Sequence, residues 1–469
     1  MTLAITFVIL AQFLIGFGFV TRLRAASNGF SLLGLSMLAG LGISSGLPFV
    51  LEFIHASIAI APMMIGLGTL AGLSLLLLRG RLAYLREIFA WQRLSLRLCE
   101  LPFLGFWAYL LFISAWKTAW YPNLPFDTIV GPDLVATFAV REHTLVSSVF
   151  TEHLPSVSIF SNQPFYAPFT AMQQIMYLLA SHGTGPFAFG KIWLTILVIA
   201  FGLFLYAELR ERTHPLLAGL LVTLLACSPE LFAYTFLLQT DWANAAFFAA
   251  GVILLQRHLE SEKQGMFIAS TLFFALACWT RTETILFVPI ASLLLLINTL
   301  RSSPKKAIVR AGALFITCLL PFVFWNYIFL RGYVALPANA HLGTYHLIVN
   351  DYFSKLLATY TSMNEQVVFD TDYWNYSVYV FLALALLNLI LFRDKQGLPI
   401  LVWIFGTYVL FGLLILHVDG ANIAYTFRRG FFKILLLMYF YLGSTSLFQW
   451  LSNWLYRWEG QSTSFHKIY

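Results

Sequence analysis

Residues 398–416 read LPILVWIFGTYVLFGLLIL, a stretch that contains no charged side chain. About 20 mostly apolar residues are enough for one helix to cross a bilayer. The same character extends over the whole chain, because 59% of its 469 residues are hydrophobic and only 10% are charged. A soluble domain has about 25% charged residues. The composition therefore excludes a soluble or peripheral protein and predicts an all-α, polytopic integral membrane protein.

Similar apolar stretches recur on both sides of this segment, with short connections between most of them. They predict about 13 transmembrane helices, within a range of roughly 11–14. We expect these helices at about 3–21, 30–54, 57–78, 101–120, 187–208, 215–237, 243–256, 265–280, 284–300, 308–330, 377–392, 398–416 and 431–450.

The connections alternate between short basic segments and longer, more acidic ones. The short set holds 19 of the 28 Lys and Arg residues. Basic connections face the cytoplasm in membrane proteins, so we expect the N-terminus outside and the C-terminus in the cytoplasm, in a bacterial inner (plasma) membrane. Because the basic residues are spread among the spans, the net charge of +7 reflects topology and predicts membrane lipids, not nucleic acid, as partners.

This pattern divides the chain into three regions. Residues 1–100 form an N-terminal three-helix membrane segment, 101–300 a membrane core with a first outer loop at 119–186, and 301–469 the C-terminal helices with a second outer loop at 331–376. Within the first loop, the stretch PFYAPFTAMQQIMYLLASH at 164–182 is moderately apolar. A span here would invert every later basic cluster, so we expect a juxtamembrane helix that lies along, or dips into, the outer membrane surface.

Ionisable residues at the predicted outer ends of several helices point to a shared polar site, since charges near a bilayer are costly and often functional. In the first loop, the spacing from Asp133 to His143 suits a short helix with Asp133 in its first turn. Either Asp133 or Asp127 is a candidate general base for an incoming hydroxyl. Helix capping explains Asp133, and a turn explains Asp127, without any catalytic role.

Three further outer segments supply the remaining candidates. Asp241, in TDWAN, starts a span and is either an N-cap or a functional carboxylate. Arg281 and Glu283, in WTRTETILFVP, are two positions apart and do not share a helix face, so they have different partners or lie in a turn. Arg428 and Arg429 break the charge trend by lying on the acidic side, where an anionic ligand or lipid phosphate would explain them.

The order of these motifs resembles the GT-C superfamily of membrane glycosyltransferases, which includes bacterial protein mannosyltransferases and aminoarabinose transferases. The resemblance covers about 101–300, with a weaker echo at 417–450. Four stretches carry it: the loop acid with the helix ending AVREH (139–143), QPFYAPFTAM (163–172), the Thr-Asp of SPELFAYTFLLQTDWANAAFF (228–248), and TRTETILFVP (280–289).

The resemblance implies a sugar transfer from a polyprenyl-phosphate donor to a glycan, lipid or protein acceptor of the cell envelope, on the outer face. It implies catalytic roles for Asp133, Asp127 and Glu142 in an inverting reaction. It implies substrate-binding roles for His143, Gln163, Tyr166, Asp241, Arg281, Glu283, Arg428 and Arg429.

Departures from the family pattern limit what the resemblance implies about metal and substrate. Some members bind a divalent metal at the counterpart of Asp241, but here that residue has no neighbouring acid. We therefore assign no metal ligand, and a divalent metal stays open as a cofactor.

Two alternative functions remain from the residues alone. A polysaccharide polymerase or ligase would share the large outer loop and arginines, whereas a transporter or flippase would place charges near the midplane and show internal repeats.

Overall fold

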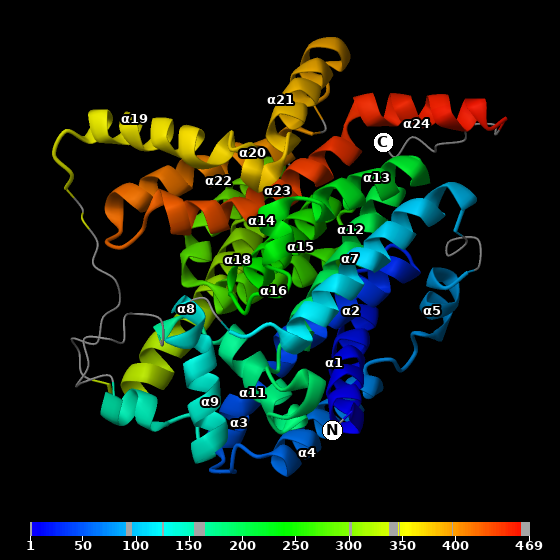
Figure 1. The fold of residues 1–469 in the computed structure, drawn as a ribbon. Coiled ribbons are helices and arrows are strands. Elements are labelled where there is room, and N and C mark those ends of the chain that lie inside the picture. The colour runs from blue at the N-terminus through cyan, green and yellow to red at the C-terminus, as the bar shows by residue number, and fades with distance from the viewer. Residues whose placement is uncertain are drawn as a thin grey trace.

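The computed structural model describes residues 2–90, 96–123, 126–153, 165–299, 303–336, 346, 348–395 and 397–460. All regular elements in these ranges are helices, which confirms the all-α fold class. The helices pack into one tilted bundle, from which the short helix α5 (Leu82–Ile88) stands apart (Figure 1).

Within the described ranges, seven helical segments are long and apolar enough to cross a membrane, or eight if a bent pair counts as one span. They are α1 (Thr2–Leu23), α2 (Gly29–Ser44) with α3 (Leu47–Phe53), α7 (Leu101–Trp120), α12 (Ile192–Arg210), η5 (Thr282–Phe287) with α17 (Val288–Thr299), α18 (Pro304–Val323) with η6 (Phe324–Tyr333), and α22 (Leu398–His417). The bent pair is η9 (Ile423–Phe427) and α23 (Arg428–Ser444), followed after a 51° bend by α24 (Ser446–Trp458).

The expected count of 13 spans is not confirmed, although every expected range contains a helix. Several of these helices are shorter than a full span: α4 (Ile60–Leu76), α13 (Pro215–Ala226), α16 (Gln264–Thr280) and α21 (Ser377–Leu387). The range 215–237 shows one physical reason. Its helix stops before Ser228, and Pro229 opens the separate short helix α14 (Pro229–Ala233), because proline cannot continue the preceding hydrogen-bond ladder.

Close helix crossings hold the N-terminal region together. A side chain at Gly16 of α1 would collide with the carbonyl oxygen of Ser36 in α2, and one at Gly40 of α2 would collide with the carbonyl oxygen of Gln12 in α1. Small residues of this kind let two backbones approach closely, which is the main way in which helices associate in a membrane. The same helix α2 packs on α12, so the N-terminal segment is joined firmly to the core.

The helix predicted for 164–182 exists, but it does not have the expected surface position. α11 (Phe169–Ser181) is buried along nearly its whole length and packs against α9 (Pro132–Glu142) and α1. Its two glutamines explain the difference, because both find partners inside the protein: Gln173 contacts Gln12, and Gln174 contacts Asp133. Together with α3 and α4, these helices form one end of the bundle (Figure 1).

Charged residues of the short connections gather at one end of the core, where Glu87, Glu211 and Glu260 lie among a larger number of basic residues. Basic residues of the short connections line a common cavity of about 1040 Å³. They are Arg24, Arg97, Arg210, Arg257 and Lys263. Arg257 lies near the last turn of α15 (Asp241–Ser261), whereas Asp241 is its first residue. A helix of this length is about 30 Å long, so the basic cavity and the Asp241 motif lie at opposite ends of the bundle.

Candidate functional site

The candidate site begins with α8 (Phe126–Ile129), the short helix of the first loop. The hydroxyl of Thr128 donates to the carbonyl oxygen of Leu238, and it accepts a hydrogen bond of 3.2 Å from Nε2 of Gln239. These two bonds fasten α8 to the segment just before α15. Asp127 is thereby held beside Asp241, although 114 positions separate them in the sequence.

Asp241 and Arg281 form the buried centre of the site. The Asp241 side chain is 1% exposed and its Oδ1 pairs with Nη1 of Arg281, which follows the last residue of α16. Nη2 of the same guanidinium lies 2.9 Å from Oε2 of Glu283. Arg281 has an extended backbone between α16 and η5, and Glu283 lies in the first turn of η5, so the two residues do not share an α-helix.

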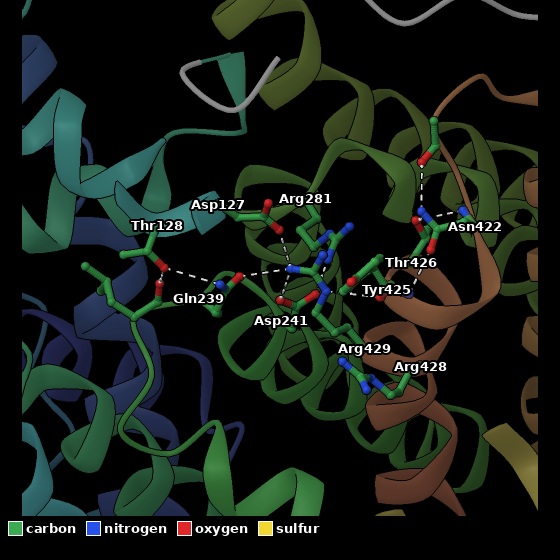
Figure 2. Close-up of polar contacts among 12 residues, drawn as sticks. Asp127, Thr128, Gln239, Asp241, Arg281, Asn422, Tyr425, Thr426, Arg428 and Arg429 are labelled. Atoms are coloured by element: carbon green, nitrogen blue, oxygen red, sulfur yellow. Dashed lines mark hydrogen bonds and ion pairs between the residues drawn. The ribbon is translucent and has the colours of Figure 1, made fainter. Parts of the chain in front are cut away.

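Arg429 joins the first loop to Asp241. Its Nη1 lies 2.7 Å from Oδ2 of Asp127, 3.0 Å from Oε1 of Gln239 and 3.7 Å from Oδ2 of Asp241. Figure 2 shows the guanidinium between these three oxygens. Because α23 begins with Arg428 and Arg429, one helix from the C-terminal region supplies the cation for acids of the first loop and of α15.

The neighbouring Arg428 pairs with a different carboxylate, that of Glu230. Nε of Arg428 lies 3.1 Å from Oε1 of Glu230, and its Nη1 donates to the Tyr373 hydroxyl at 3.1 Å. Burial raises the pKa of Glu230, although the charges of Arg428 and Arg429 oppose this rise. Sequence reasoning missed Glu230, because an acid directly after Ser-Pro in a helix start is an ordinary first-turn residue.

Lys433 is a second residue that sequence reasoning missed. Its side chain is 2% exposed, and its Nζ lies 3.7 Å from Oε1 of Glu283. It follows Arg429 by four positions on the same helix, which places both on one face. That spacing, together with a lysine in an otherwise apolar helix, was the available signal.

The site therefore combines four carboxylates with four cations in a largely buried setting. They are Asp127, Glu230, Asp241 and Glu283, and Arg281, Arg428, Arg429 and Lys433. Charges removed from water interact strongly and are costly when unpaired. The expected convergence of Asp127, Asp241, Arg281, Glu283, Arg428 and Arg429 is what the structure contains.

Tyr166 lies beside this cluster. Burial raises the pKa of its hydroxyl, and the charges of Arg281, Asp127, Arg429 and Asp241 all act on it. Gln163, from the same motif, lies outside the described residues.

Asp133 occupies a separate polar environment on the first turn of α9, as its sequence position predicted. Gln174 donates to its Oδ1 at 3.1 Å. Burial raises the pKa of Asp133, an effect opposed by hydrogen bonds from Asn123 and Gln174 and by the charge of Lys191. Burial in turn lowers the pKa of Lys191 to about 8. The described contacts of Asp133 include none of the four cations of the cluster.

Glu142 and His143 lie at the other end of α9 from Asp133, and both are exposed. The Glu142 carboxylate accepts hydrogen bonds from the backbone N–H and the hydroxyl of Ser148. The Nδ1 atom of His143 lies 3.2 Å from the carbonyl oxygen of Ile58. These contacts order the segment that follows α9, and they do not bring the two residues to the arginines.

A divalent metal could use oxygen ligands of the kind found around Arg429, since carboxylate and amide oxygens suit hard cations. However, the guanidinium already lies between those oxygens. Among the described residues, one other cluster has suitable ligands, namely Cys99, His214 and Glu459 at the basic end of the bundle. There Nδ1 of His214 accepts the Leu216 N–H, so the neutral ring carries its proton on Nε2, 3.1 Å from Glu459. Neither arrangement fits a metal as it stands.

Comparison with known proteins gives one family. Residues 163–325, about a third of the chain, match the model of the dolichyl-phosphate-mannose-protein mannosyltransferase family. No curated protein and no solved structure matched. The matched region contains α11, Asp241, Arg281 and Glu283, whereas the first-loop acids and α23 lie outside it. The match confirms the resemblance to membrane glycosyltransferases of the GT-C superfamily over that part of the chain.

Proposed function

We propose, from the family match and the geometry of the site, that this chain transfers a sugar from a polyprenyl-phosphate donor to a cell-envelope acceptor. The observation that carries the proposal is the convergence of Asp127, Asp241, Arg281 and Arg429 from four separate segments. A carboxylate beside two buried guanidinium groups suits a reaction in which a hydroxyl loses a proton and a phosphate leaves.

In the proposed reaction, the acceptor oxygen attacks the anomeric carbon from the side opposite the phosphate. The bond between that carbon and the phosphate oxygen breaks, and its electron pair stays on the polyprenyl phosphate. The acceptor proton passes to Asp127. Arg281 and Arg429 stabilise the negative charge that builds up on the leaving phosphate, because their positions are fixed before the reaction begins.

Donor binding also prepares Asp127 for its role. Nη1 of Arg429 is paired with Oδ2 of Asp127 at 2.7 Å. A phosphate arriving beside this guanidinium competes with the carboxylate for its N–H groups, since arginine binds phosphate strongly. The carboxylate then has an oxygen available for the acceptor hydroxyl. This order of events would keep the base inactive until the donor is in place.

The side of the membrane on which the proposed transfer takes place is inferred from the distribution of charged residues. The basic cavity lies at the end of α15 opposite to Asp241, and basic connections face the cytoplasm. We therefore place the transfer at the outer face of a bacterial inner membrane. Charges at helix ends favour an interfacial transferase over a transporter, which would use the midplane.

The test uses purified protein in liposomes with a panel of polyprenyl-phosphate sugars, beginning with the mannose donor because of the matched family. Released polyprenyl phosphate is measured by mass spectrometry, with a membrane extract as acceptor source. We expect the wild-type protein to consume one donor. The double variant Asp127→Asn/Asp133→Asn, which lacks both candidate bases, should lose this activity.

The matched control is Asp419→Asn. This carboxylate is 52% exposed and pairs with His346 away from the arginines, so its loss should leave release of polyprenyl phosphate unchanged. If the double variant matched the wild-type rate, neither Asp127 nor Asp133 would be the base, and the proposed mechanism would be excluded. Failure of every donor in the panel, with exchange of labelled lipid between leaflets instead, would favour the flippase alternative.

A further inference from the structure

The position between Asp127 and Asp241 has the oxygen ligands of a metal site, yet it holds a side-chain nitrogen. A single atom, Nη1 of Arg429, contacts oxygens of three residues from two segments: Asp127 of the first loop, and Gln239 and Asp241 at the start of α15. The Arg429 side chain is 10% exposed and that of Asp241 is 1% exposed, so this grouping is built into the interior. Two carboxylates and an amide are the groups that Mg²⁺ or Mn²⁺ would choose.

We infer that the Arg429 guanidinium is a built-in cation that takes the place of a divalent metal between Asp127 and Asp241. The inference deepens the proposed transfer, but its main test is metal binding, which needs no turnover. The chain would therefore be a metal-independent member of its reaction class.

Distances support this assignment. The contacts of Nη1 to Asp127 and Gln239, at 2.7 and 3.0 Å, are lengths of charge-assisted hydrogen bonds. A bound Mg²⁺ requires oxygens at about 2.0–2.1 Å. The ion and the guanidinium therefore exclude each other, because both need the same lone pairs and the same space.

The buried oxygen of Asp241 supplies a second argument. Its Oδ2 makes no hydrogen bond among the described residues, and the nearest ion-pair contact is Arg429 at 3.7 Å. Its Oδ1 is taken by Arg281. If the Arg429 side chain were truncated, Oδ2 of Asp241 would lose its nearest cation. The oxygens of Asp241, Asp127 and Gln239 would then surround the position that the guanidinium had filled. Such a group should attract a divalent ion.

The experiment measures Mn²⁺ binding to the purified full-length protein by electron paramagnetic resonance. We expect the wild-type protein to bind no Mn²⁺ that depends on Asp241. The variant Arg429→Ala should gain one Mn²⁺ per chain, and Arg429→Ala/Asp241→Asn should lose it again. Arg428→Ala is the matched control, because its guanidinium contacts Glu230 and Tyr373 instead, and it should gain none.

Two results would overturn the inference. One is Mn²⁺ bound to the wild-type protein and lost in Asp241→Asn, since ion and guanidinium would then coexist. The other is a folded Arg429→Ala protein, monodisperse on size exclusion, that binds no more Mn²⁺ than the wild type. Should Arg429→Ala not fold, Arg429→Gln takes its place, and the wild-type titration decides in either case. Resistance of sugar transfer to EDTA is a separate readout, so failure of the proposed function is distinguishable from failure of this inference.

Discussion

Replacing Asp127 with asparagine separates the two candidate bases of the first loop. Asparagine keeps the size of the side chain and one carbonyl oxygen, so it still accepts a hydrogen bond from Arg429. It does not take a proton from an acceptor hydroxyl. We expect Asp127→Asn to stop sugar transfer, while Asp133→Asn retains it, because Asp133 is bonded to Gln174 and not to the cluster of cations.

The expected fall in the rate of Asp127→Asn follows from the proposed role of Asp127 as a general base. General-base catalysis contributes roughly 10²- to 10⁴-fold to a rate, which is about 3–5 kcal/mol of barrier. The loss in free energy of unfolding should be smaller than this change in the reaction barrier. The Asp127 side chain is 21% exposed, and Arg429 retains Gln239 and Asp241. We therefore expect a loss of about 1–3 kcal/mol in stability, between the values for exposed and fully buried pairs.

The assay compares both variants in liposomes over a range of donor concentrations that reaches saturation, so that kcat reports the chemical step and KM reports donor binding. Donor KM should fall in Asp127→Asn, because the donor phosphate no longer competes with a carboxylate for Arg429. Asp127→Glu provides a further comparison. It restores a carboxylate that is displaced by one methylene, and partial recovery of kcat is expected from it.

The opposite pattern would refute this reasoning. If Asp133→Asn lost about 10²-fold or more of kcat and Asp127→Asn kept full activity, the base would be Asp133. The ion-pair cluster would then be a structural or donor-binding element, and proximity to the arginines would not identify the base.

Three further outcomes follow from the structure. Lys433→Met should change the free energy of unfolding by no more than about 1 kcal/mol, because removing the buried ammonium removes both its desolvation cost and its attraction to Glu283. The same variant should lower kcat roughly tenfold. A much larger loss of stability would contradict this. Gly40→Ala should destabilise the protein in detergent melts by about 1–3 kcal/mol through collision with α1, whereas Gly72→Ala, which meets nothing, should not. Burial lowers the pKa of Lys191 from 10.5 to about 8. Between these two pH values the unfolded chain binds more protons than the folded protein, so the free energy of unfolding should rise with pH across that window. In Lys191→Met, the free energy of unfolding should change less with pH over the same window.

The sequence was informative where a motif lies at a helix end. Asp241, Arg281 and Arg429 could be predicted because charged residues next to long apolar stretches are rare and costly. The first-loop helix could be predicted because Asp133 and His143 frame it well, and α9 (Pro132–Glu142) lies within one residue of those bounds.

Contacts between distant segments could not be predicted in the same way. Nothing in the local pattern says that Gln239 meets Arg429, 190 positions away, or that Gln174 turns inward to Asp133. The moderately apolar stretch that forms α11 was expected at the membrane surface, since apolar residues facing protein and facing lipid are alike in sequence. Glu142 was similarly ambiguous, because its use as a partner for Ser148 depends on a local turn.

The position of α23 near the C-terminal end has a consequence for biosynthesis. Ribosomes complete Asp127, Glu230, Asp241 and Glu283 long before Arg428, Arg429 and Lys433, and Arg281 is the one cation of the cluster made early. Until the late helix inserts, the four carboxylates of this cluster have one cation, Arg281, among the cluster residues already made. Assembly of the centre therefore waits until residues 428–433 have been synthesised, and premature termination before residue 428 should give a chain that quality-control proteases remove.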